Sequence, residues 1–267
     1  LEDKIYRYYI ELNKESIVKE ILSLKEIKKG ARPSNIFKRN GDITLYDKYF
    51  KGIEESFLDN IREDISLIAY IKSHYKNEVI NQVFDYFASF NRNINELGYI
   101  YDPGQQINTL QKYLENDDIK TKMEKLISEF DIGVTGFKIK KKELEKNNFQ
   151  ISVQGIHNTE EENNLLDFAY ESRGTQSLFF VLGSLLSGLK KDSIVIIDEL
   201  ETGFHPEAVS KLISYFIDEN AEGKSQLIVT SHSFSFINNL DMHQIYLTEK
   251  DSKSVSTCKR LNAIEGV

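Results

Sequence analysis

The sequence predicts an α/β fold in which a parallel sheet follows an antiparallel β-subdomain and a helical arm. Three observations support this prediction. The run from Ile194 to Ile197 is four consecutive β-branched apolar residues, typical of a strand buried on both faces of a parallel sheet. A second apolar run, 227–229, follows a helix-like segment that begins at Pro206, which makes a β-α-β unit. Near the start of the chain, from residue 4, aromatic and β-branched residues alternate with polar ones, as in antiparallel strands.

The remaining elements of the first half follow in chain order. Alternation predicts two short strands over 4–22 and another strand pair around 36–46, joined by a cationic turn that we interpret as a solvated hairpin. Apolar residues at helical spacing predict two helices over 53–91. Two further helices are predicted over 105–130, separated near Asn116.

After Gly133 the pattern changes from helical spacing to strict alternation. This predicts a hairpin over 137–154. Its charged tip, 140–148, is interpreted as a solvated loop in preference to a phosphate contact. One more strand is predicted over 244–249.

Composition limits the classes of protein to which the chain can belong. Lys and Arg number 34 against 42 Asp and Glu, a net charge of −8, so the chain as a whole is not a strongly basic nucleic-acid binder, although a local DNA contact remains open. The single Cys258 excludes an intrachain disulfide and a cysteine-rich zinc site, and indicates a reducing, cytoplasmic compartment. The apolar stretch 178–189 is too short to span a membrane and is broken by Gly and Ser, so no membrane partner is expected.

Two acids directly follow the buried strand. Asp198 and Glu199 therefore stand at its carboxyl end, where α/β sheets bind ligands. In nucleotide hydrolases, an Asp at this place holds Mg²⁺ on the phosphates, and a following Glu can polarise the attacking water. His232 ends the second strand and is expected beside the pair, near a γ-phosphate. The plain alternatives are a strand that ends at a charged turn and a histidine with a structural role.

The segment 171–176 immediately precedes an apolar helix, 177–189. Ser172 is a candidate N-cap, and Gly174 would let an anion approach the backbone N–H groups at the positive end of the helix. The segment therefore predicts an anion-binding helix start. An ordinary capped helix has the same pattern and remains the alternative.

Together these motifs resemble those of ABC-type ATPases. Ser172-Arg173-Gly174-Thr175-Gln176 is similar to the ABC signature, 194–199 to the Walker B motif, 202–206 to the D-loop, and His232 to the H-loop histidine. They look most like bacterial AAA-family ATP-binding proteins of anti-phage systems, which are related to overcoming-lysogenization-defect proteins and to RecF and SMC ATPases. The β-rich start of the chain resembles the β-subdomain of the same family, so the resemblance covers nearly the whole chain.

The resemblance implies a P-loop NTPase fold of the ABC type, with an antiparallel β-subdomain at 1–50, a helical arm at 51–130 and an ABC lobe at 131–267. It implies a Mg²⁺-dependent ATPase that works as a homodimer or higher homo-oligomer through its ABC heads and signals to an effector protein, such as a nuclease or a toxin. Asp198 would organise Mg²⁺ through water, and Glu199 would be the general base.

It also implies roles for the remaining motif residues. His232 would contact the γ-phosphate. The signature would complete the ATP site of the other subunit, and its contacting residues are Ser172, Arg173, Gly174, Thr175 and Gln176.

The sequence departs from the family in lacking a P-loop, G-x-x-x-x-G-K-[ST]. Its only Gly-Lys pair, Gly223-Lys224, has Asp218 in place of the first glycine and is interpreted as a turn. In the family the P-loop precedes the β-subdomain, so it is expected before Leu1. One flank of the strand 194–197 is then expected to have no neighbour in this chain.

Two other functions remain open. One is a non-hydrolytic scaffold with an ABC-like surface. Asp198, Glu199 and His232 speak against it, because a scaffold has no chemical need for these side chains. The other is a DNA-associated clamp ATPase of the SMC or RecF type, for which 51–130 is too short to form the long coiled coil.

Overall fold

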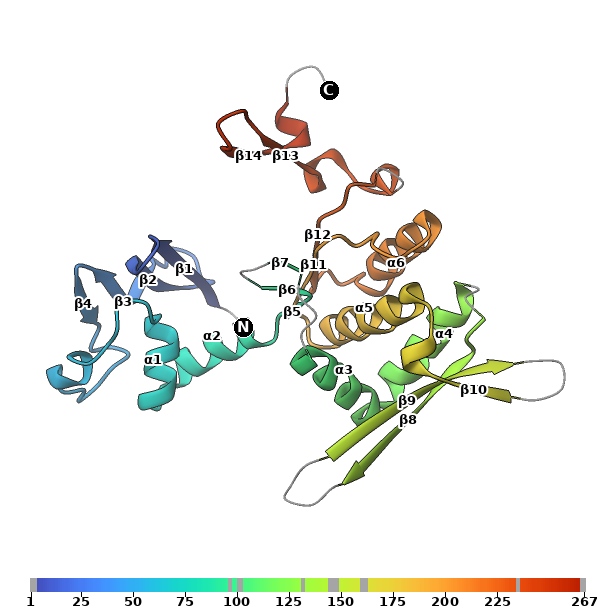
Figure 1. Ribbon diagram of the computed structural model, residues 1–267. Helices are drawn as coiled ribbons and strands as arrows, with labels where there is room; N and C mark the ends of the chain where they lie inside the picture. The colour runs from blue at the N-terminus through green and yellow to red at the C-terminus, as the bar shows by residue number, and fades with distance from the viewer. Residues whose placement is uncertain are drawn as a thin grey trace. The chain divides into compact units, whose positions relative to one another are not determined.

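The computed structural model describes residues 4–95, 98–99, 103–130, 133–143, 149–158, 163–233 and 236–264. The chain forms two compact units, Leu1–Ala88 and Ser89–Val267 (Figure 1). Each unit has its own hydrophobic core. The segment 51–130, expected as one helical arm, contributes its first two helices to the first unit and its last two to the second.

The first unit is built on a four-stranded antiparallel sheet in the order β1-β2-β3-β4, which confirms both predicted strand pairs. Its helices pack on the sheet, because Leu22 and Phe37 of the sheet share one core with Ile71 and Ile80 of the helices. The elements are β1 (Lys4–Leu12), β2 (Ile17–Glu26), β3 (Ser34–Asn40), β4 (Asp42–Leu45), a 3₁₀ helix (Glu55–Leu58), α1 (Leu67–His74) and α2 (Glu78–Ala88).

A buried carboxylate joins the sheet of this unit to α1. Glu20 of β2 is fully buried, and its two oxygens accept the backbone N–H of Leu67 at 3.0 and 2.9 Å. The Tyr8 hydroxyl donates to the same carboxylate at 2.8 Å, and the Arg39 guanidinium lies 3.9 Å away. Burial raises the pKa of Glu20 in spite of these partners.

The second unit is organised around one long helix, α5, which packs against the three other α-helices among its described residues. Asn116 caps α4 by accepting the N–H of Ile119, which confirms the predicted break between two helices. Gly183 lets α3 approach α5 closely, since a β-carbon there would lie 2.3 Å from Cγ2 of Thr109. The helices are α3 (Pro103–Glu115), α4 (Asp117–Glu129), α5 (Arg173–Lys190) and α6 (Pro206–Glu219).

A three-stranded parallel sheet, β12-β11-β5, lies beside α5. Its strands are β5 (Asn91–Arg92), β11 (Ile194–Ile197) and β12 (Gln226–Val229), which confirms the predicted β-α-β unit. The expectation that one flank of β11 would lack a neighbour is wrong, because Val195 pairs with Asn91. The helical span predicted to residue 91 is too long, because α2 ends at Ala88 and a strand of two polar residues gives no periodic signal.

A second sheet, β10-β9-β8, is antiparallel and packs on α5 through Phe137, which contacts Phe179. Its strands are β8 (Gly136–Glu143), β9 (Phe149–Asn158) and β10 (Asn163–Asp167), which confirms the predicted hairpin. Residues 144–148 of the expected charged tip lie outside the described residues. β10 was not predicted.

Two small hairpins complete the second unit: β6 (Ile94–Asn95) with β7 (Gly98–Tyr99), and β13 (Tyr246–Lys250) with β14 (Ser256–Arg260). The strand expected at 244–249 is thus present, with an additional partner. In the described part of the chain, no helix has both the length and the apolar character needed to cross a bilayer.

Candidate functional site

The predicted acids and the end of the second strand lie together at the carboxyl edge of the parallel sheet. Because Ile197 pairs with Val229, the next residues, Asp198 and Thr230, leave the sheet opposite each other. The Thr230 hydroxyl donates to Oδ1 of Asp198 and accepts the backbone N–H of Glu199 at 2.9 Å. One hydroxyl therefore fixes the positions of both acids.

Asn93, which follows β5, holds Asp198 from the other side. Its side-chain oxygen accepts the backbone N–H of Asp198 at 2.7 Å, and its amide nitrogen donates to the Asp198 carbonyl at 3.0 Å. The Asn93 backbone N–H also donates to the carbonyl of Ile196 at 3.3 Å. The ends of all three strands thus determine where the half-buried Asp198 carboxylate lies.

Glu199 is exposed and adopts a left-handed backbone, with φ of 49°. A non-glycine residue pays about 1–2 kcal/mol for this conformation. Its carboxylate accepts the Thr202 hydroxyl at 3.2 Å, and its carbonyl accepts the Thr202 N–H at 2.9 Å. The turn therefore holds an exposed carboxylate at the residue that follows Asp198.

His232 is held by its backbone. Its N–H donates to Oε1 of Glu201 at 2.6 Å, which ties the segment after β12 to the turn after β11. Burial raises the pKa of Glu201, but hydrogen bonds from the Ser231 hydroxyl and from backbone N–H groups, together with the charge of nearby His232, lower it by more, so this pKa lies below its ordinary value. His232 itself is exposed, and its ring has no hydrogen bond to another described residue.

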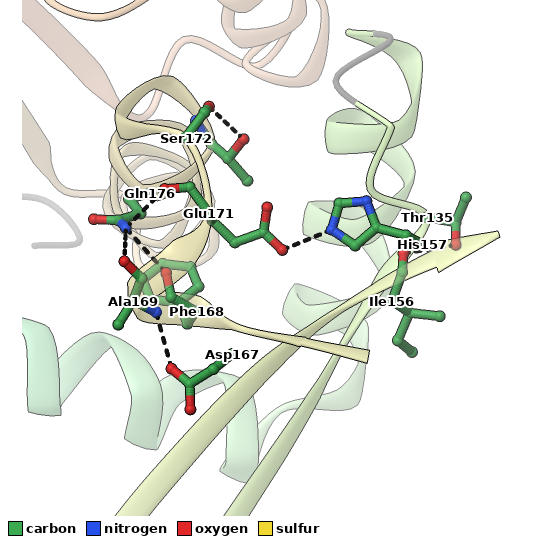
Figure 2. A network of polar contacts seen from close by, with 10 residues as sticks. Thr135, Ile156, His157, Asp167, Phe168, Ala169, Glu171, Ser172 and Gln176 are labelled. Carbon is green, nitrogen blue, oxygen red and sulfur yellow. Dashed lines mark hydrogen bonds and ion pairs between the residues drawn. The ribbon is translucent and has the colours of Figure 1, made fainter. Parts of the chain in front are cut away.

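Ser172 caps α5 as predicted: its hydroxyl oxygen accepts the Thr175 N–H at 3.0 Å and lies 2.8 Å from the Thr175 hydroxyl (Figure 2). The Gln176 side-chain amide donates to the carbonyls of Phe168 and Glu171, each at 3.0 Å. These three side chains are therefore engaged in shaping the helix start.

The backbone of the helix start remains available to a ligand. Among the described residues, the N–H groups of Arg173 and Gly174 have no acceptor, as in the open first turn of a helix. These groups carry the partial positive charge of the helix end and can bind an anion.

The helix start also lies against the turn that follows the acids. A β-carbon on Gly174 would be 2.5 Å from the carbonyl oxygen of Gly203, whose own φ is 85°. Within the described residues, no hydrogen bond joins 172–176 to Asp198 or Glu199. The start of α5 and the turn after the acids are thus in contact through the backbone of two glycines. No described hydrogen bond connects the two predicted parts of the site.

The Asp198 carboxylate suits a magnesium ion. Mg²⁺ usually keeps several waters and binds one or two carboxylates together with substrate phosphates, and Asp198 with the adjoining Thr230 hydroxyl offers oxygen ligands of this kind. Among the described residues, no three His, Cys, Asp or Glu side chains form a metal-binding group by themselves.

Sequence reasoning missed the supporting residues Asn93, Glu201 and Thr230. Thr230 had a usable signal, since it follows the second strand at the register of Asp198. Asn93 follows a strand too short to be recognised, and Glu201 lies in a turn whose course depends on tertiary contacts.

A comparison with protein-family models matches residues 3–238 to the family described as "AAA domain, putative AbiEii toxin, Type IV TA system". No curated protein matches the chain in a sequence comparison.

Several solved structures show distant similarity. The SMC head domain from Thermotoga maritima is 13% identical over 96% of this chain and 73% of its own, with a TM-score of 0.37. An SmcHead bound to the C-winged helix domain of ScpA is 12% identical over 97% of this chain and 75% of its own, with a TM-score of 0.41. The Smc head domain from Pyrococcus furiosus is 12% identical over 91% and 73%, with a TM-score of 0.35. At these scores the similarity establishes neither a shared activity nor a shared partner.

Proposed function

Because this chain belongs to the AAA-domain family whose model it matches over residues 3–238, we propose that it is the ATP-hydrolysing head of an ABC-type ATPase. The observation that carries the proposal is the contact between Asp198 and Thr230. It brings an acid pair to the edge of a parallel sheet, where α/β proteins bind their ligands. His232 follows the same strand end two residues after Thr230.

Each residue has a defined task in the proposed reaction. Glu199 takes a proton from the water that attacks the γ-phosphorus, as the bond to the ADP oxygen breaks. Asp198 would hold Mg²⁺ through water, and the bound ion would offset negative charge on the phosphates. His232, whose ring is exposed, holds a γ-phosphate oxygen.

We place the P-loop that this chemistry needs on a segment outside residues 1–267. The structure supports the interpretation of Gly223-Lys224 as a turn, because these residues lie between the end of α6 and the start of β12. Gly223 has a φ of 65°, and the Lys224 ammonium forms an ion pair with Glu222 at 2.5 Å.

The segment 172–176 is proposed to act in trans. In a dimer of heads, the free N–H groups of Arg173 and Gly174 would meet the phosphates of ATP bound by the second copy. Phosphate binding at the start of α5 would also affect the turn after the acids, since Gly203 in that turn contacts Gly174. We propose that the resulting opening and closing of the dimer signals to an effector protein in anti-phage defence. The toxin–antitoxin systems named in the family description are consistent with such a partner.

The proposal is tested by replacing Glu199 with Gln in the intact protein. ATP turnover is expected to fall roughly 10²–10⁴-fold, because the general base is lost, while ATP binding persists. Glu207→Gln, which changes an exposed acid on α6, serves as the matched control and should leave turnover unchanged. Wild-type turnover in Glu199→Gln would overturn the proposal and would leave the non-hydrolytic scaffold as the better explanation.

A further inference from the structure

A buried carboxylate lies immediately before the helix start and takes no part in the site described above. Glu171 has only 4% of its side chain exposed. A carboxylate at such a position is costly unless it is paired. Its partner is His157 of β9, whose Nε2 donates to Oε1 of Glu171 at 2.8 Å (Figure 2).

The backbone of β9 accommodates this carboxylate. A β-carbon on Gly155 would lie 2.0 Å from Oε1 of Glu171 and 3.1 Å from its Cδ, so no other residue fits here without displacing Glu171. Gly155 and His157 are two apart on the strand and therefore face the same side. One strand thus supplies both the space and the hydrogen bond for the carboxylate.

The backbone of Glu171 is tied to α5. Its carbonyl accepts the Gln176 amide at 3.0 Å, and its N–H donates to the carbonyl of Phe168 at 3.2 Å. The next residue, Ser172, is the N-cap of α5. Glu171 is therefore held by its side chain to β9 and by its carbonyl to the helix start.

We propose that Glu171 and His157 are positioning residues that set the start of α5 for phosphate binding and link it to the β10-β9-β8 sheet, a role that rests on the proposed ATPase function. A shift of β9 moves residue 171, and with it Ser172 and the N–H groups of Arg173 and Gly174. Gly203 also contacts the start of α5, at Gly174. A shift of the helix start therefore changes its contact with the turn that follows Asp198 and Glu199. A protein that binds or bends this sheet would then control hydrolysis at a distance from Asp198.

The test compares variants of His157 in the intact protein. His157→Phe keeps a ring and removes the donor, and kcat is expected to fall roughly 10-fold or more with an unchanged dissociation constant for ATP, because the helix start acts after ATP is bound. His157→Gln, which restores an amide donor, is expected to recover most of kcat. Val153→Ala is the control for a loss of stability alone. Val153 lies on the same strand as His157 and is buried in the core of the second unit, so this variant should lower Tm without lowering kcat.

Loss of kcat in Val153→Ala in proportion to Tm, or failure of His157→Gln to recover activity, would overturn the positioning role. Hydrogen exchange at the backbone amides of Thr175 and Gln176 gives a readout that needs no ATPase activity. If the wild-type protein hydrolyses no ATP, the proposed function fails. The positioning role is then supported by faster exchange in His157→Phe that His157→Gln reverses, and overturned by unchanged exchange.

Discussion

Gly174 and Gly203 meet backbone to backbone: a β-carbon on Gly174 would lie 2.5 Å from the carbonyl oxygen of Gly203. Gly174 belongs to the first turn of α5, and Gly203 to the turn that follows Asp198 and Glu199. The start of α5 and the turn after the two acids are therefore in direct backbone contact, with no space for a side chain between them.

Replacing Gly174 with Ala is expected to push these segments apart. The added methyl group should lower the free energy of unfolding by about 1–3 kcal/mol through overpacking, and ATP turnover should fall by roughly 10–100-fold because the helix start is displaced. Urea unfolding and steady-state ATPase assays measure the two effects. Ser184→Ala, a half-buried position further along the same helix, is the control. Equal turnover in the two variants would contradict the prediction.

The hydroxyl of Thr230 should be needed for both acids. Thr230→Val keeps the shape but leaves Oδ1 of Asp198 without its donor and the Glu199 N–H without its acceptor. A loss of about 1 kcal/mol in unfolding free energy is expected, with turnover lowered by about tenfold or more. Thr230→Ser, which retains the hydroxyl, should behave like the wild type. If Val and Ser variants are equally active, the hydroxyl does not position the acids.

Mixed dimers test whether the helix start acts in trans. Ser172→Arg and Glu199→Gln subunits should each be inactive alone, but a mixed dimer contains one site with an intact base and an intact signature. Random association should then recover about a quarter of wild-type turnover if the two sites act independently. The measurement is ATPase activity after co-refolding or co-expression, with light scattering to establish that dimers form. No recovery in dimers of proven composition would contradict the composite site.

Glu20 and Arg39, the buried ion pair of the first unit, should be energetically coupled. Glu20→Leu leaves Arg39 buried without a counter-charge and removes the acceptor of the Leu67 N–H, so a loss of about 3–5 kcal/mol in unfolding free energy is expected. The double variant with Arg39→Met is expected to lose less than the sum of the single variants. Denaturant unfolding of the wild type, the two single variants and the double variant completes a double-mutant cycle. Strictly additive losses in unfolding free energy would argue against coupling between Glu20 and Arg39.

Glu20 also predicts a pH dependence. Burial raises the pKa of Glu20 in the folded state, so its contribution to stability is complete below the unfolded value, about 4.3, and is lost as the pH rises through the folded value. Glu20→Gln cannot release this proton. The difference in unfolding free energy, wild type minus variant, should therefore decrease from about pH 4 towards neutrality. A difference that grows with pH would mean that the folded pKa is lowered.

The parts of the fold with strong local signals were predictable. The apolar run of β11, the Pro206 start of α6, the break at Asn116 and the cap at Ser172 all depend on neighbouring residues, and the structure has each of them. The two-residue strand β5 had no such signal, because its place beside β11 is determined by contacts with residues about a hundred positions away.

The residues of the candidate site also fall into those that the sequence predicts and those that only the structure reveals. Asp198, Glu199 and His232 were identified because they end apolar runs. Asn93 became recognisable only through its hydrogen bonds to Asp198, and the buried carboxylate of Glu171 only through its contact with His157. Such partners are set by tertiary structure, which a single sequence does not reveal.

The left-handed backbone at Glu199 has a consequence for how this family changes over generations. Gly adopts this φ without a steric penalty, and Asn at a lower one than Glu. A lineage that no longer needed the carboxylate would gain stability by replacing Glu199 with either residue. We therefore expect Glu at this position in relatives that hydrolyse ATP, and Gly or Asn to be tolerated in relatives that do not.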